Sequence, residues 1–86
     1  MKSGEWSLYI LRCRNGELYT GIAVDVAKRF EAHCAGKGAK YTRGRGPLTL
    51  VYQEVCGTHS EALKREYWIK MLTRQEKEAL IRSQAE

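Results

Sequence analysis

Two short hydrophobic runs near the N-terminus are separated by a turn signal. Residues 6–13 and 17–22 are rich in β-branched, aromatic and aliphatic side chains, a composition typical of strands. Asn15-Gly16 lies between the two runs, and this dipeptide is the strongest short-range signal for a hairpin. We therefore predict that a β-hairpin opens the fold.

The next apolar positions follow helical spacing. Asp25 can cap a helix over residues 26–35, and Gly36 can end it. Val26 and Phe30 lie four residues apart, so they share the face of this helix that should pack inward.

The second half of the chain carries signals for one further strand and two helices. Residues 48–55 are predicted to form a third strand. The S/T-x-x-E capping box occurs at residues 58–61 and 73–76, and it precedes helical runs over residues 59–72 and 74–84. The order β-β-α-β-α-α predicts an α/β (α+β) domain with a small sheet.

Length and charge narrow the class of protein. The chain has 86 residues, so we expect residues 1–86 to form a single domain without a linker or an internal repeat. No stretch approaches the roughly 18 to 20 apolar residues of a membrane-spanning helix. The 15 Lys and Arg residues outnumber the 10 Asp and Glu residues, which gives a net charge of +5. This balance favours an anionic partner such as nucleic acid or a membrane surface.

Glycines and cations are concentrated in residues 36–47, a segment with four glycines, four cations and no acid. Glycine lets a backbone approach a ligand closely, and exposed N–H groups together with Lys and Arg suit phosphate oxygens. A solvated surface loop is the alternative interpretation. The predicted nucleic-acid-binding residues are Lys37, Lys40, Arg43 and Arg45.

The cysteine pattern indicates free thiols. Cys13, Cys34 and Cys56 are odd in number and form no CxxC pair, so no disulfide framework is expected. The N-terminal residues lack the apolar region of a secretory signal. We therefore expect the protein to work in the reducing cytoplasm.

Two tyrosines flank the predicted hairpin turn, and the length of that turn decides where they point. A two-residue loop would pair Tyr9 with Ile22 and place Tyr9 and Tyr19 on opposite faces. A three-residue loop with Gly16 in the left-handed region would pair Tyr9 with Gly21 and place both phenols on one face. The local sequence leaves both turns open.

Arg29 and His33 lie four residues apart in the first predicted helix and therefore share a face. They could converge on one anion, with arginine as a fixed charge and histidine as a proton carrier. An ordinary exposed surface pair is the alternative.

Glu66 is an acid in the inward arc of the helix predicted over residues 59–72. It lies between Ala62 and Ile69 on one side and Leu63 on the other. A carboxylate that is buried there needs a cation, a metal ion or a hydrogen-bond donor. A structural ion pair with an arginine or lysine is the alternative to a metal ligand.

Taken together, these positions resemble the GIY-YIG nuclease superfamily, and within it the small single-domain bacterial branch of UPF0213-type proteins. The two signature tripeptides stand as Ser-Leu-Tyr at residues 7–9 and Tyr-Thr-Gly at residues 19–21, with Arg29 eight residues further on. The glycine-rich segment 36–44 and the run over residues 61–66 resemble the same branch. The resemblance covers nearly the whole chain, with a core of about residues 6–81.

The resemblance implies a three-stranded sheet flanked by helices, and hydrolysis of a nucleic-acid phosphodiester, most readily in DNA, with one divalent ion, Mg²⁺ or Mn²⁺. Glu66 would hold the metal ion, and Arg29 would stabilise charge on the phosphate. Tyr9 or Tyr19 would activate the attacking water, and His33 would hydrogen-bond at the phosphate or help to move a proton. This set suits the chemistry, because the transition state gathers negative charge that a cation and a hard metal ion can neutralise.

Two positions depart from the pattern of that superfamily. Ile22 follows the second signature where DNA-repair relatives typically have a lysine, and Ala23 stands where the small branch is expected to have a threonine. The missing lysine removes a cation that could lower the pKa of a nearby tyrosine.

Two other classes of function remain open at this point. One is a nucleic-acid-binding module on the same fold with little or no catalysis. The other is a structural metal-binding protein that uses Cys56 and His59 with His33 and Cys34, although these pairs lack standard zinc-ligand spacing. A domain of this size has few groups for reading bases, so sequence specificity would require a protein partner.

Overall fold

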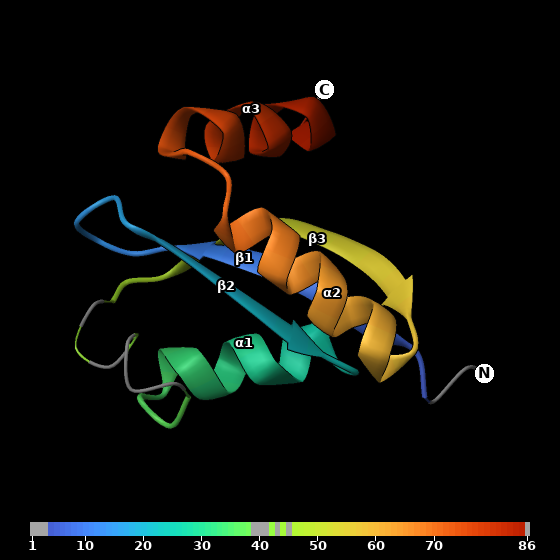
Figure 1. Ribbon diagram of the computed structural model, residues 1–86. Helices are drawn as coiled ribbons and strands as arrows, with labels where there is room; N and C mark the ends of the chain where they lie inside the picture. Colours follow the sequence, from blue (N-terminus) through green and yellow to red (C-terminus); the bar gives the residue numbers. More distant parts are fainter. Residues whose placement is uncertain (1–3, 39–41, 43, 45, 86) are drawn as a thin grey trace.

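The computed structural model confirms the predicted order of elements (Figure 1). It describes residues 4–38, 42, 44 and 46–85. The elements, in chain order, are β1 (Trp6–Arg12), β2 (Leu18–Ala23), α1 (Val26–Cys34), β3 (Thr49–Gly57), α2 (His59–Lys70) and α3 (Arg74–Ala85).

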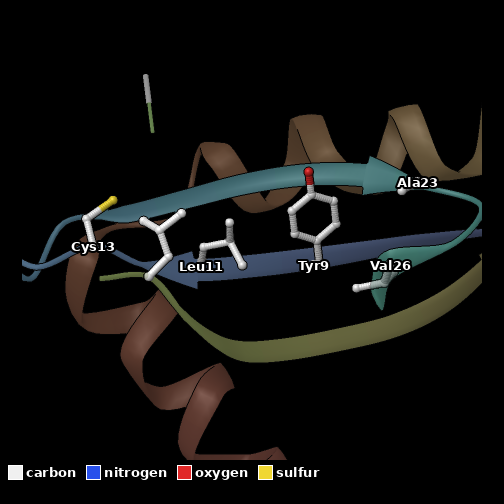
Figure 2. Close-up of a cluster of buried hydrophobic side chains, with 6 residues drawn as sticks. Tyr9, Leu11, Cys13, Ala23 and Val26 are labelled. Atoms are coloured by element: carbon white, nitrogen blue, oxygen red, sulfur yellow. The ribbon is translucent and has the colours of Figure 1, made fainter. Parts of the chain in front are cut away.

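The three strands form one antiparallel sheet in the order β2-β1-β3, so β1 lies at its centre. Helix α1 covers one face of the sheet, and α2 and α3 cover the other (Figure 1). This arrangement explains why β1 is apolar on both faces: Leu8 and Ile10 pack toward α2 and α3, while Tyr9 and Leu11 pack toward α1. Figure 2 shows Tyr9 and Leu11 on the same side of the sheet.

The hairpin turn is the three-residue form. The carbonyl of Cys13 accepts a hydrogen bond from the Gly16 N–H at 2.8 Å, and Gly16 has a φ of 89°. The register pairs Tyr9 with Gly21 and Leu11 with Tyr19. Both tyrosines therefore lie on one face of the hairpin, which decides between the two turns that the sequence allowed.

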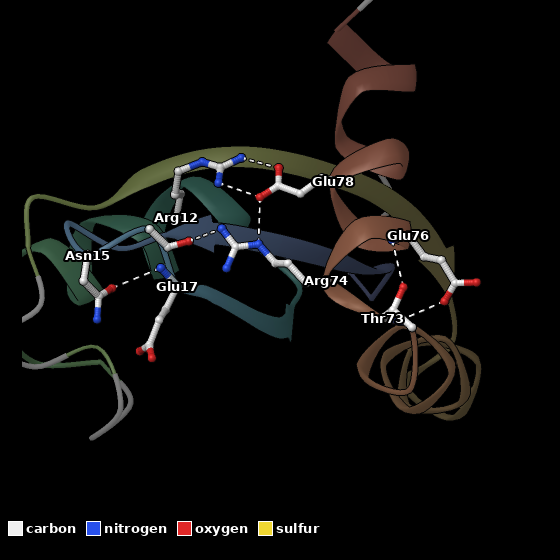
Figure 3. Close-up of polar contacts among 8 residues, drawn as sticks. Arg12, Asn15, Glu17, Thr73, Arg74, Glu76 and Glu78 are labelled. Carbon is white, nitrogen blue, oxygen red and sulfur yellow. Dashed lines mark hydrogen bonds and ion pairs between the residues drawn. The ribbon is translucent and has the colours of Figure 1, made fainter.

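The predicted helix caps are present. Asp25 accepts a hydrogen bond from the Lys28 N–H at 3.0 Å, and the capping box of α2 is complete between Thr58 and Glu61. The second capping box precedes α3, where the Thr73 N–H donates to Glu76 at 2.8 Å and the Glu76 N–H donates to Thr73 at 3.1 Å (Figure 3). Each such cap contributes about 1 kcal/mol to helix stability.

An ion-pair cluster ties the hairpin to the last helix. Arg12 donates two hydrogen bonds of 2.8 Å to the Glu78 carboxylate, and Arg74 donates to the same carboxylate at 2.9 Å (Figure 3). Arg74 also donates to the Gly16 carbonyl at 2.7 Å. These hydrogen bonds hold the pKa of Glu78 at about 2, against an ordinary value of 4.5. The cluster anchors the hairpin on which the candidate site is built.

Two expectations about α2 and one about β3 need correction. Helix α2 ends at Lys70 rather than at residue 72, because the Met71 and Leu72 N–H groups bond three residues back and close the last turn. Leu63 lies outside the inward arc, with 45 % of its surface exposed. Strand β3 extends to Gly57, because Trp6 of β1 pairs with it.

Two further expectations concern thiols and membranes. Cys13, Cys34 and Cys56 form no disulfide in the structure. Among the residues that the structure describes, none of the helices has the length and apolar character needed to cross a bilayer.

Candidate active site

Three aromatic side chains gather where the hairpin meets α1. The ring centroids of Tyr9 and Tyr19 are 6.4 Å apart, and those of Tyr19 and His33 are 5.3 Å apart. The two tyrosines come from neighbouring strands and the histidine comes from the last turn of α1. The structure thus places these three side chains beside one another.

His33 is almost fully enclosed in this cluster, with 2 % of its surface exposed. Its Nε2 is 2.9 Å from the Tyr9 hydroxyl, and its Nδ1 is 2.8 Å from the Thr42 hydroxyl. Burial lowers the pKa of His33 from its ordinary value of 6.5, and the positive charge of Arg29 lowers it further. The imidazole is therefore neutral at neutral pH, so it can accept a hydrogen bond at one nitrogen and donate one at the other.

Arg29 lies one turn before His33 on α1, and it is exposed to solvent. Its positive charge acts on the Tyr9 hydroxyl and opposes the rise in the pKa of that phenol. A shallow hollow of about 290 Å³ opens beside it, lined by Ala23, Asp25, Lys28, Arg29 and Ala32. The guanidinium therefore reaches from the enclosed aromatic cluster to the surface, where an anion could contact it.

The charges around Tyr9 connect the hairpin, α1 and α2. Burial raises the pKa of Tyr9 above its ordinary value of 10.0, and the charges of Tyr19 and Glu66 raise it further, while the hydrogen bond and charge of Arg29 oppose this rise. The phenol is therefore protonated at neutral pH. Glu66 lies on the helix that packs on the other face of the sheet, and yet its charge acts on Tyr9.

Glu66 is partly buried, with 19 % of its side chain exposed, as the inward arc of α2 predicted. Its carboxylate forms an ion pair with Lys70 one turn later, at 3.2 Å, and the Lys70 side chain is 54 % exposed. An exposed lysine can move away at little cost. The carboxylate is therefore available to a hard cation.

Gly21, the last residue of the second signature tripeptide, leaves the space that the Tyr9 side chain occupies. An added Cβ at Gly21 would lie 2.6 Å from the Tyr9 hydroxyl oxygen and 3.1 Å from the Tyr19 ring. The glycine lets both phenols lie against β2.

The basic segment is described only in part. Lys37 is exposed, and its N–H bonds to the Ala32 carbonyl at 2.8 Å. The other residues predicted to contact phosphate, Lys40, Arg43 and Arg45, lie outside the described residues.

Thr42, from the same segment, is the site residue that sequence reasoning missed. It is 2 % exposed and bonds to His33. Its position between charged residues and glycines gave no signal beyond that of a loop.

The structural zinc alternative finds no support from the described residues. None of their His, Cys, Asp and Glu side chains form a group of three that could share a metal ion. The His59 ring packs against Trp6 with a centroid distance of 4.4 Å, whereas His33 bonds to Tyr9 and Thr42.

Comparison with known proteins gives a consistent result. The model of a family described as the GIY-YIG catalytic domain matches residues 5–79. A UPF0213 protein of Cronobacter sakazakii is 56 % identical over 77 residues, which cover 90 % of this chain and 81 % of that protein. A UPF0213 protein of Yersinia pestis is 53 % identical over 81 residues, which cover 94 % of this chain and 85 % of that protein.

Two solution NMR structures share the fold. The UPF0213 protein BH0048 from Bacillus halodurans is 47 % identical with a TM-score of 0.58, and the match covers 90 % of this chain and 82 % of that one. The protein EF2693 from E. faecalis is 34 % identical with a TM-score of 0.62, and the match covers 95 % of this chain and 88 % of that one. The predicted α/β class and three-stranded sheet are thus confirmed.

Proposed function

The chain belongs to the GIY-YIG family, and on that premise we propose that it is a metal-dependent endonuclease that hydrolyses phosphodiester bonds in nucleic acid, with DNA as its main substrate. The observation that carries the proposal is the convergence of Tyr9, Tyr19 and His33 on one face of the sheet, one turn from the exposed Arg29. The charges of Arg29 and Glu66 both affect the pKa of Tyr9, which supports the same grouping. Phosphodiester hydrolysis needs groups that activate water and groups that neutralise the phosphate, and this site contains both kinds.

The donor chemistry at Glu66 fits Mg²⁺ or Mn²⁺. Hard divalent ions are commonly held by one or two carboxylates, water and substrate phosphates rather than by a full set of protein ligands. Glu66 would hold the ion, and Lys70 would give up its ion pair. Such an ion, when bound, supplies positive charge that polarises the phosphate and stabilises the transition state.

The two tyrosines have different surroundings, and we assign them different roles. Tyr9 is 1 % exposed and its hydroxyl bonds to His33, so it holds the histidine in place and does not contact bulk water. Tyr19 is only partly buried, and it is the tyrosine that we assign to the attacking water.

Arg29 and His33 act on the phosphate and on protons respectively. Arg29 is exposed beside the hollow on α1, where it would neutralise a phosphate oxygen as negative charge grows. His33, neutral because burial and Arg29 lower its pKa, accepts a hydrogen bond from the Tyr9 hydroxyl at Nε2 and so holds that proton in place. Ile22 in place of a lysine leaves Arg29 with a larger share of the neutralisation.

A nucleic-acid-binding module without catalysis is the second candidate, favoured by the net charge of +5 and the basic segment. The three free thiols support a reducing compartment such as the cytoplasm. A partner protein would supply sequence specificity in either case.

A substrate panel tests the proposal. The purified full chain is incubated with single-stranded, duplex, nicked and branched DNA, and with RNA, in Mg²⁺, in Mn²⁺ and in chelator. We expect cleavage of at least one DNA that stops in chelator. Binding to these nucleic acids without cleavage in either metal would favour the binding module instead.

A further inference from the structure

The His33 ring is fixed by hydrogen bonds at both of its nitrogens. Nε2 is 2.9 Å from the Tyr9 hydroxyl on β1, and Nδ1 is 2.8 Å from the Thr42 hydroxyl in the glycine-rich segment. All three residues are almost fully buried, with 1 to 2 % of their surface exposed. An imidazole held at both nitrogens has a fixed orientation, and because each hydroxyl can donate or accept, its tautomer is set by which of the two hydroxyls donates.

A second residue of the glycine-rich segment limits the position of the ring. An added Cβ at Gly38 would lie 2.3 Å from Nδ1 of His33 and 2.7 Å from its Cγ. The backbone of Gly38 does not have a positive φ, so its conformation does not require glycine. The lack of a side chain is what matters at this position, because it leaves space for the ring. The backbone at Gly38 therefore lies directly against the imidazole.

The direction of the hydrogen bonds follows from Arg29. The positive charge of Arg29 acts on the Tyr9 hydroxyl, and a nearby cation favours the orientation in which the hydroxyl oxygen faces the charge and its proton points away. The Tyr9 hydroxyl is then free to donate its own proton to Nε2 of His33. A neutral imidazole carries one N–H group, so when Nε2 accepts, Nδ1 carries the ring proton. Nδ1 then donates a hydrogen bond to the Thr42 oxygen. The chain of hydrogen bonds runs from Tyr9 through His33 to Thr42.

We propose that Thr42 and Gly38 are positioning residues for His33. The Thr42 hydroxyl oxygen accepts a hydrogen bond from the Nδ1–H, which keeps Nε2 unprotonated and directed at Tyr9, and Gly38 leaves the room that the ring needs. The glycine-rich segment thus has a role inside the site in addition to its expected binding of phosphate. Any effect of Thr42 and Gly38 on cleavage rests on the proposed function. The tautomer of His33 is a property of the folded chain and can be measured without cleavage.

The tautomer is measured directly by NMR of the full chain labelled with ¹⁵N at histidine, using correlations between ring nitrogens and ring carbon-bound protons. His59→Gln assigns the signals, because the chain has two histidines. We expect wild-type His33 to be protonated at Nδ1 and not at Nε2. Thr42→Ser should keep this spectrum, and Thr42→Val and Gly38→Ala should shift it toward a mixture of tautomers. Thr49→Val, the same change at an exposed position of β3, should have no effect.

Two spectroscopic results would overturn the proposal. One is a wild-type His33 that carries its proton on Nε2, a measurement that needs no variant and therefore holds even if Thr42→Val does not fold. The other is a folded Thr42→Val protein with the wild-type tautomer.

Cleavage gives an independent readout. Loss of a group that orients a catalytic side chain typically costs about 10- to 100-fold in activity. We expect this loss in kcat for Thr42→Val with little change in KM, and we expect Thr42→Ser to restore the rate. An active wild type and an equally active Thr42→Val would contradict the positioning role. If neither the wild type nor any variant cleaves any substrate, the proposed function fails. The NMR measurement of the His33 tautomer still tests the positioning role of Thr42.

Discussion

Tyr9 and His33 are 24 residues apart in the sequence, and the hydroxyl of one lies 2.9 Å from Nε2 of the other. The bond joins the central strand of the sheet to the helix on one of its faces. Because both groups are buried, each would lose a partner if the other were removed, which costs about 1 to 3 kcal/mol for an unsatisfied polar group. The same bond therefore serves stability and the proposed chemistry.

Acid should destabilise the protein through His33. Its folded pKa is below 6.5 because of burial and the Arg29 charge, so the unfolded chain binds the proton more readily. The stabilising contribution is complete above pH about 6.5 and is lost as the pH falls toward the folded pKa, with a slope of at most about 1.4 kcal/mol per pH unit. The measurement is the free energy of unfolding in denaturant between pH 7.5 and 5.5.

His33→Gln is the control for that measurement, because it keeps a polar side chain without the titration. Glu54, Glu61 and Glu78 have lowered pKa values, so they stay ionised in this range in both proteins. We expect a flatter pH dependence in the variant. Equal slopes would show that His33 does not set the acid sensitivity.

The two tyrosines should respond differently to removal of the hydroxyl. Tyr19→Phe should lower kcat by about 100-fold or more, because general acid–base groups contribute about 10²- to 10⁴-fold. Tyr9→Phe should also lower the free energy of unfolding, because it leaves Nε2 of buried His33 without its partner. Single-turnover cleavage and denaturation of both variants test this division. An active Tyr19→Phe beside an inactive but stable Tyr9→Phe would reverse the two assignments.

Glu78→Gln should destabilise the chain at neutral pH. The variant loses the charge that pairs with Arg12 and Arg74, and for partly exposed pairs the cost is about 1 kcal/mol. The folded pKa of about 2 lies below the ordinary 4.5, so the stabilisation is present above pH 4.5 and is lost as the pH falls toward 2.

Urea denaturation at pH 7 and pH 3 checks this account of Glu78. The difference in stability between the wild type and the variant should be smaller at pH 3 than at pH 7. Glu31→Gln, at an exposed position of α1, should match the wild type at pH 7. If Glu78→Gln is as stable as Glu31→Gln, the ion-pair cluster around Glu78 does not stabilise the fold.

The basic segment should bind phosphate groups independently of the DNA sequence. On duplex DNA, each phosphate that a protein cation neutralises adds about 0.9 to the steepness of log K against log salt. Changing Lys37, Lys40, Arg43 and Arg45 to Ala should therefore flatten the slope by up to about 3 to 4 units and weaken binding to all sequences alike. Arg29→Ala is the contrast, because it should reduce cleavage far more than the slope. An unchanged affinity and slope in the four-residue variant would identify the segment as a solvated loop.

The local parts of the fold were readable from the sequence because their signals are local. Asn15-Gly16 marks the hairpin, Asp25 caps α1, and the two capping boxes mark the starts of α2 and α3. Each of these depends on residues within one turn of chain. Their agreement with one another fixed the order of elements.

The parts that failed or stayed open depend on distant contacts. The choice between the two turns depends on the register of β1 against β2, and the exposure of Leu63 depends on how α2 is rotated on the sheet. Thr42 is recognisable only once the chain has placed it beside His33. Arg12 and Glu78 are 66 residues apart in the sequence, so no local sequence pattern predicts that they form an ion pair.

The charge of Glu66 is the most direct test of the nuclease itself. Glu66→Gln keeps size and hydrogen bonding but removes the charge that a hard divalent ion requires. Lys70→Gln is the matched control, because it breaks the same ion pair from the other side and leaves the carboxylate. The measurement is single-turnover cleavage of DNA at saturating Mg²⁺ by folded protein. We predict a loss of at least about 100-fold for Glu66→Gln and near wild-type cleavage for Lys70→Gln. A Glu66→Gln protein that cleaves as fast as the wild type would contradict the assignment of Glu66 to the metal ion, and with it the proposed mechanism.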